Sequence, residues 1–190
     1  MTSVLRCSYY CIVELSLVDP SLVLLVGPSG AGKSTFARAH FGPHETVSSD
    51  HCRALVSNDA NDQTATRAAF AVLHAIIYHR LERGLLTVVD ATNVLPESRA
   101  PLLGFARLWR VPAVAIVFDL PVATCVARNV ARAERTVPSD VVARQRAEMH
   151  ASLAGLAAEG VARTVTLREE AEVAAFRVVR AKDIPSNLHR

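Results

Sequence analysis

The most informative segment of the sequence is Gly27-Pro28-Ser29-Gly30-Ala31-Gly32-Lys33-Ser34-Thr35. It fits the pattern G-x-x-x-x-G-K-[ST] and lies between an apolar run at 22–26 and a helical stretch at 32–40, as a phosphate-binding loop requires. Its glycines let backbone N–H groups curl around phosphate oxygens, and the helix that follows presents its positive end. Lys33 can reach the β- and γ-phosphates, while the Ser34 hydroxyl can ligate Mg²⁺. All nine residues are therefore predicted to bind a nucleotide.

Outward from this loop, short apolar runs alternate with longer helical stretches. Strands are expected at 22–26, 45–49, 85–90, 113–119 and 161–167, with a short edge strand at 176–179; helices are expected at 32–40, 61–83, 96–110, 121–135 and 139–159. Strands that are apolar throughout and alternate with helices are typical of a doubly wound parallel sheet. The length of 190 residues predicts one domain spanning 1–190.

Composition excludes several classes of protein. Hydrophobic residues make up 51% of the chain, which is enough to build a core. Four cysteines are too few for a disulfide scaffold, and their spacing predicts no metal site. The longest apolar stretch, 111–118, is short of the roughly 20 residues that span a bilayer. No membrane contact and a cytoplasmic location are therefore expected.

Asp50 ends the second expected strand and Arg53 follows one helical turn later. At the carboxyl edge of a parallel sheet, a carboxylate can orient an attacking hydroxyl and accept its proton. Arg53 would share its face and could bind a phosphate on the acceptor. The alternative for Asp50 is a helix N-cap, a position that aspartate favours.

Asp90 ends the apolar strand at 85–90. This arrangement resembles a Walker B strand, whose carboxylate supports Mg²⁺ directly or through water. The alternative is another capping residue for the turn that follows.

Residues 125–146 contain five arginines and only two acidic residues, so the net charge of this segment is +3, equal to that of the whole chain. Arg128, Arg132 and Arg135 recur at spacings of four and three and therefore line one helix face. We expect this segment to be a helical lid that brings arginines to the transferring phosphoryl group, where they can stabilise developing charge. A solvated basic face is the alternative.

The segment from Gly27 to about Gly160 resembles the 5′-OH polynucleotide kinase domain of the bacterial polynucleotide kinase-phosphatase RNA-repair enzymes. The matching stretches are GPSGAGKSTFA at 27–37, SSDHCRALVS at 48–57, NDQT at 61–64, TVVDATN at 87–93 and RNVAR at 128–132. The first and fourth recur in many small P-loop kinases, whereas the second and third, in that order, are more specific.

This resemblance implies a P-loop NTPase fold with a five-stranded sheet in the order 2-3-1-4-5. It implies transfer of the γ-phosphoryl group of ATP to 5′-OH ends of RNA or DNA in nucleic-acid repair, with Mg²⁺ as cofactor. It places Lys33 and Ser34 at the triphosphate and Mg²⁺, Asp50 as general base, and Arg53 on the neighbouring phosphate of the acceptor. Arg128 and Arg132 are similar to the lid arginines of the family.

The sequence lacks the phosphatase and ligase motifs that accompany such kinase domains. We therefore expect either a free-standing kinase or an excised domain, with homo-oligomers and separate phosphatase or ligase proteins as candidate partners. Two other functions remain open on the same scaffold. One is a kinase of a small metabolite or nucleoside, and the other is a nucleotide-binding regulatory or toxin-like protein without kinase turnover.

Overall fold

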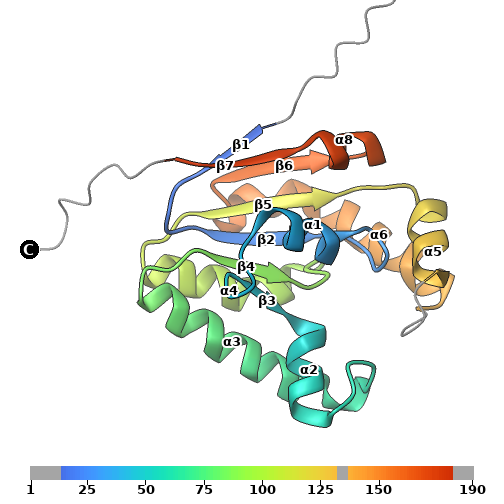
Figure 1. Ribbon diagram of the computed structural model, residues 1–190, viewed down its shortest axis with the longest axis horizontal. Coiled ribbons are helices and arrows are strands. Elements are labelled where there is room, and N and C mark those ends of the chain that lie inside the picture. The colour runs from blue at the N-terminus through green and yellow to red at the C-terminus, as the bar shows by residue number, and fades with distance from the viewer. Residues whose placement is uncertain (1–13, 132–136, 182–190) are drawn as a thin grey trace, which may run out of the picture.

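The computed structural model describes residues 14–131 and 137–181 (Figure 1). Its main elements, in chain order, are β1 (Glu14–Leu17), β2 (Leu22–Val26), α1 (Lys33–His40), β3 (Thr46–Ser48), α2 (Ser49–Ser57), α3 (Thr66–Glu82), β4 (Thr87–Asp90), α4 (Pro96–Leu108), β5 (Ala113–Phe118), α5 (Val122–Val130), α6 (Ser139–Ser152), α7 (Leu156–Glu159), β6 (Arg163–Leu167), α8 (Glu170–Ala175) and β7 (Arg177–Arg180). Two short 3₁₀ helices, η1 (Gln63–Ala65) and η2 (Leu153–Gly155), precede α3 and α7.

Five strands form the main sheet in the order β3-β4-β2-β5-β6, and all four pairings are parallel. In the order of the five strands along the sequence this is 2-3-1-4-5, so the predicted α/β class and the strand order that the resemblance implies are both confirmed. Because every strand runs the same way, the loops after β2, β3, β4 and β5 gather at one edge of the sheet.

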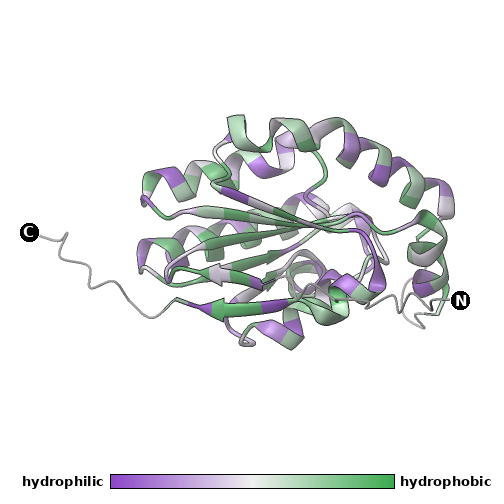
Figure 2. Cartoon of the chain, turned by 90° about the horizontal axis from the view of Figure 1, so that it is seen from above, coloured by the Kyte–Doolittle hydropathy of each residue, from purple (hydrophilic) through white to green (hydrophobic). Residues whose placement is uncertain are grey.

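The sheet separates two hydrophobic clusters, because successive side chains of a strand point to opposite faces. In the central strand β2, Leu22 and Leu24 belong to one cluster with α3 and α4, whereas Val23 and Leu25 belong to the other with α1. All five residues of β2 are fully buried, which explains its unbroken apolar sequence. Figure 2 shows helices on both sides of the strands, with hydrophobic residues concentrated in the strands between them.

The expected edge strand at 176–179 forms, as β7, but it does not join the main sheet. It pairs in parallel with β1, a strand that the sequence analysis did not anticipate. Leu15 and Leu17 of β1 are buried, and they belong to the same cluster as Phe176 and the α1 residue Phe36. The two-stranded sheet therefore covers the α1 side of the core.

Several helices differ from their expected limits. Residues 49–57 form α2, and the expected helix at 61–83 begins with the 3₁₀ turn η1, where the Asp62 carboxylate accepts a hydrogen bond from the backbone N–H of Thr64. The expected helix at 139–159 breaks at Ser152, whose hydroxyl donates to the carbonyl oxygen of Val94. In the described residues no helix is long and apolar enough to cross a membrane.

Candidate active site

The loop between β2 and α1 starts the site. Gly30 has φ of 81°, and a Cβ atom at this position would lie 2.1 Å from the carbonyl oxygen of Cys125 in α5. Only glycine fits there, since other residues would combine a left-handed backbone with a steric clash. The loop is also held to the segment that follows β4, because the backbone N–H of Gly27 donates to the carbonyl oxygen of Thr92 at 2.9 Å.

Lys33 is the first residue of α1 and is 8% exposed. Its Nζ donates to the carbonyl oxygens of Gly27 and Pro28, both at 2.8 Å, so the ammonium group lies across the loop that precedes it. The next residue, Ser34, is hydrogen-bonded to the Asp90 carboxylate at the end of β4. The loop and the fourth strand thus meet at one point.

Asp90 is 7% exposed, and burial raises the pKa of its carboxyl group above the ordinary value. The negative charge of Asp50 raises this pKa further, while the Ser34 hydrogen bond and the positive charges of Lys33 and Arg38 oppose the shift. The carboxylate and hydroxyl oxygens of Asp90 and Ser34 are the hard donors that Mg²⁺ prefers. Among the described residues there is no group of three or more acidic, histidine or cysteine side chains that could hold a metal ion by themselves.

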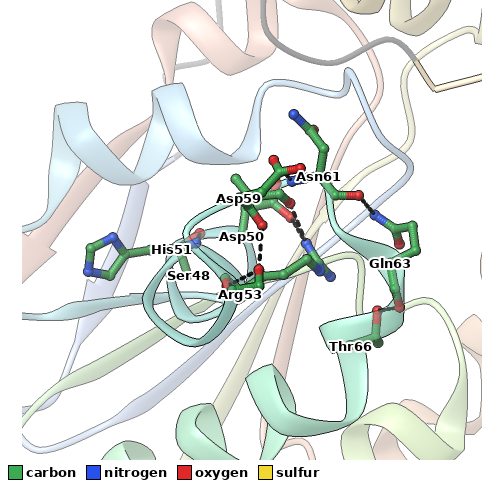
Figure 3. A network of polar contacts seen from close by, with 10 residues as sticks. Ser48, Asp50, His51, Arg53, Asp59, Asn61, Gln63 and Thr66 are labelled. Atoms are coloured by element: carbon green, nitrogen blue, oxygen red, sulfur yellow. Dashed lines mark hydrogen bonds and ion pairs between the residues drawn. The ribbon is translucent and has the colours of Figure 1, made fainter.

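Asp50 lies in the first turn of α2 and is not its N-cap. The cap is Ser48, whose hydroxyl oxygen accepts from the backbone N–H of His51 at 3.5 Å. The capping interpretation of Asp50 is therefore wrong, because the helix begins at Ser49, two residues earlier than that interpretation requires. The Asp50 carboxylate instead accepts from NH1 of Arg53 at 2.6 Å (Figure 3).

Arg53 is held almost completely inside the protein, with 5% of its side chain exposed against 48% for Asp50. Its NH1 also donates to the carbonyl oxygen of Ala60, at 3.0 Å. The buried Nε of Arg53 has no acceptor among the residues that the structure describes. The ion pair with Asp50 therefore leaves part of the guanidinium unsatisfied, and an additional acceptor would stabilise it.

One cavity of about 180 Å³ brings these groups together. Its walls include Lys33 and Ser34 from the start of α1, Asp50 and Arg53 from α2 and Asp90 from the end of β4, together with Gln63, Phe70, Asn129, Val137 and Gln145. The same cavity is thus lined by the phosphate-binding loop, by the Asp90 carboxylate with the Ser34 hydroxyl beside it, and by the Asp50 carboxylate with its buried partner Arg53. This arrangement can hold a triphosphate and present a proton acceptor to a hydroxyl group.

Arg128 of α5 lies beside the loop, but it lines a second cavity, of about 800 Å³, on the other side of Gly32. Its guanidinium donates to the carbonyl oxygen of Ala31 at 3.4 Å and pairs with the Glu170 carboxylate of α8 at 2.8 Å. Thr35 of the loop and Arg177 of β7 also line this cavity.

Part of the expected lid can be compared with the structure. Residues 125–130 belong to α5 and residues 139–146 to α6, while Arg132 and Arg135 lie outside the described residues. Arg146 pairs with Asp119 at the end of β5, at 2.8 Å, so it contacts the sheet edge instead of the loop.

Sequence reasoning missed Gln145 of α6. Its Oε1 accepts from the backbone N–H of Ser29 at 2.9 Å, a contact between residues 116 positions apart in the chain. A glutamine within a helix carries no signal of its own, so only the placement of α6 beside the loop could reveal it.

The fold and the site define this chain as a P-loop phosphotransferase of the kinase type. A family comparison agrees: the chain belongs to the AAA domain family, whose model matches residues 22–156. No curated protein matches.

Solved structures with the same fold include kinases. A chain of the Pnkp1/Rnl/Hen1 RNA repair complex is 23% identical, with a TM-score of 0.62, over 73% of this chain and 47% of that one. A chain from a second structure of the Pnkp1/Rnl/Hen1 complex is 26% identical, with a TM-score of 0.50, over 60% of this chain and 40% of that one. A putative kinase from Chloroflexus aurantiacus is 11% identical, with a TM-score of 0.57, over 83% of this chain and 95% of that one. This chain thus spans less than half the length of the two RNA repair chains.

Proposed function

We propose that this protein is an ATP-dependent polynucleotide 5′-hydroxyl kinase that acts on RNA or DNA ends in nucleic-acid repair. The observation that carries the proposal is the Asp50–Arg53 pair, which faces Lys33 across one cavity. A kinase of this kind needs a proton acceptor for the attacking hydroxyl and a cation for the phosphate next to it, and this pair supplies both.

The triphosphate of ATP would lie on backbone N–H groups of residues 30–35, with Lys33 moving from the loop carbonyls to the β- and γ-phosphates. The second cavity, beside Arg128 and Thr35, is the proposed place of the nucleoside. Ser34 and Asp90 would hold Mg²⁺, which neutralises charge on the phosphates during transfer. In this proposal Arg128 and Arg132 act as the lid arginines.

Asp50 takes the proton of the 5′-hydroxyl as its oxygen forms a bond to the γ-phosphorus; the bond from that phosphorus to the bridging oxygen breaks, and ADP leaves. Arg53 holds the Asp50 carboxylate in position through their 2.6 Å contact. Its remaining N–H groups would contact the next phosphate of the acceptor. Phe70 offers an apolar surface for a nucleobase in the same cavity.

Support for a polynucleotide acceptor comes from the ordered sequence motifs and from the fold of the Pnkp1 complex chains. A kinase of a small metabolite is the second candidate, because a gluconokinase from Sinorhizobium meliloti has the same fold, with a TM-score of 0.52 and 17% identity. The two candidates share the loop, Asp50 and Asp90 and differ in the acceptor alone.

The test measures transfer from γ-labelled ATP to 5′-OH RNA, 5′-OH DNA, a nucleoside 3′-monophosphate and gluconate side by side. We expect labelled oligonucleotides, with kcat reduced by about 10²–10⁴-fold in Asp50→Asn because the general base is lost. Lys33→Ala should abolish transfer, whereas Asp59→Asn, an exposed change just beyond α2, should leave it unchanged. Label on gluconate but on no oligonucleotide would refute the polynucleotide proposal.

A further inference from the structure

Helix α6 reaches the phosphate-binding loop through one side chain. The backbone N–H of Ser29 points at Gln145, and the atom that it meets at 2.9 Å must be the carboxamide oxygen, because an N–H group cannot donate to an NH₂ group. The orientation of the Gln145 carboxamide is thereby fixed by its partner.

With its oxygen on the loop, Gln145 keeps two N–H donors on Nε2. Within the described residues, the contact with Ser29 is the only hydrogen bond of this side chain. Gln145 also lines the cavity that contains Lys33, Asp50 and Arg53. A neutral donor group is thus anchored at the wall of the space between the triphosphate cradle and the proposed base.

We propose that Gln145 is a catalytic residue that donates a hydrogen bond from Nε2 to an oxygen of the transferring phosphoryl group. The Oε1–Ser29 contact holds the carboxamide in place during this step, so the donor is preorganised and costs little reorganisation when charge develops. The inference rests on the proposed function in one respect, namely that the γ-phosphoryl group of ATP occupies this cavity.

A purely structural role is the competing explanation, in which Gln145 only fastens α6 to the loop. The two roles differ in the sign of one substitution. Gln145→Glu keeps an acceptor for the Ser29 N–H but replaces the donors with negative charge. If Gln145 only holds α6 to the loop, Gln145→Glu should do less harm than Gln145→Ala. If Gln145 faces phosphate oxygens, Gln145→Glu should do more harm, because like charges repel.

The experiment compares Mg²⁺-dependent binding of ADP and of β,γ-imido-ATP by calorimetry in the wild type, Gln145→Ala and Gln145→Glu. Ala143→Glu, which adds the same charge at an exposed position of α6, is the matched control. We expect Gln145→Glu to weaken β,γ-imido-ATP at least about tenfold and Gln145→Ala to weaken it less, with ADP affinity unchanged, since only the γ-phosphate contacts Nε2. In transfer assays Gln145→Ala should lower kcat by about 10²-fold, as loss of one transition-state donor does.

Two results would overturn the proposal: Gln145→Glu binding the analogue as the wild type does, or both variants losing ADP and analogue affinity equally. The binding comparison requires no acceptor, so it still decides the role of Gln145 if oligonucleotides are not phosphorylated. A wild type that binds neither nucleotide overturns this inference and the proposed function together.

Discussion

Replacement of Arg99 by methionine should destabilise the protein strongly, although this residue lies outside the cavity. Arg99 of α4 is fully buried and makes a two-pronged ion pair with Glu159 of α7, at 2.7 Å from Nε and 2.6 Å from NH2. Its NH1 also donates to the carbonyl oxygen of Asn93 at 2.8 Å. Asn93 in turn donates from Nδ2 to the carbonyl oxygen of Leu25 in β2, so the pair supports the strand that leads into the loop.

Removing one partner of a buried ion pair costs about 3–5 kcal/mol, because a charge is left without compensation. Glu159 keeps 19% of its side chain exposed, so water can partly solvate the stranded carboxylate and the lower end of this range, about 3 kcal/mol, applies. For a chain of this length 1 kcal/mol shifts Tm by about 2–4 °C, so Arg99→Met should lower Tm by about 6–12 °C.

Thermal and urea unfolding monitored by circular dichroism would measure this loss. Arg67→Met, at an exposed position of α3, is the matched control and should stay within about 0.5 kcal/mol of the wild type. The double variant Arg99→Met/Glu159→Leu should recover part of the loss, because it removes the stranded charge. A loss below about 1 kcal/mol in Arg99→Met, or a double variant no more stable than the single one, would refute the reasoning.

Two further predictions concern the site. Gly30→Ala should unfold at lower temperature and lose nucleotide binding, because its Cβ would meet the Cys125 carbonyl oxygen. The control Gly84→Ala, with φ of 64° and open space around it, should lower the free energy of unfolding by only about 1 kcal/mol and keep nucleotide binding. Equal effects of the two variants in calorimetry and thermal unfolding would contradict the steric argument. Asp90→Asn should raise Tm at neutral pH without Mg²⁺ while abolishing phosphoryl transfer. Because burial raises the pKa of Asp90 in the folded state, the wild type loses stability as pH rises from the ordinary value of 3.8 through the raised one, so the advantage of the variant should shrink as pH falls. A Tm difference that stays constant as the pH falls from 8 to about 4, near the ordinary pKa of 3.8, would count against this cause.

Much of the fold follows from local sequence. The run at 22–26 could be assigned because a strand buried on both faces is apolar at every position, and β2 is fully buried. The limits of α2 and the break at Ser152 could not be assigned. They depend on side-chain hydrogen bonds, of Ser48 within its turn and of Ser152 to the distant carbonyl oxygen of Val94, that apolar periodicity does not encode.

The pairing of β1 with β7 shows the same limit at longer range. Each strand has four residues, and neither is long enough to specify a partner by pattern alone. They meet because the buried side chains of Leu15 and Leu17 complete the cluster around α1.

For the site, the sequence by itself determined the chemistry of the loop. The order of Gly30, Lys33 and Ser34 predicts a loop of the phosphate-binding type, because the residues that define this motif are close together in the chain. It also placed Asp90 at the end of a strand, since parallel strands deliver their carboxyl ends to one edge. Asp50, expected to end the second strand, lies in the first turn of α2 instead, because β3 ends at Ser48 and the helix begins at Ser49.

Only the tertiary structure decided which of these groups face one another. It showed that Asp50 is paired with a buried Arg53 and does not cap its helix, that Arg128 borders a different cavity, and that Gln145 of α6 contacts the Ser29 amide. Each of these facts depends on how the helices pack against the sheet. This packing sets the distances between residues that are far apart in the sequence, and it selects one partner for a side chain that could have had several.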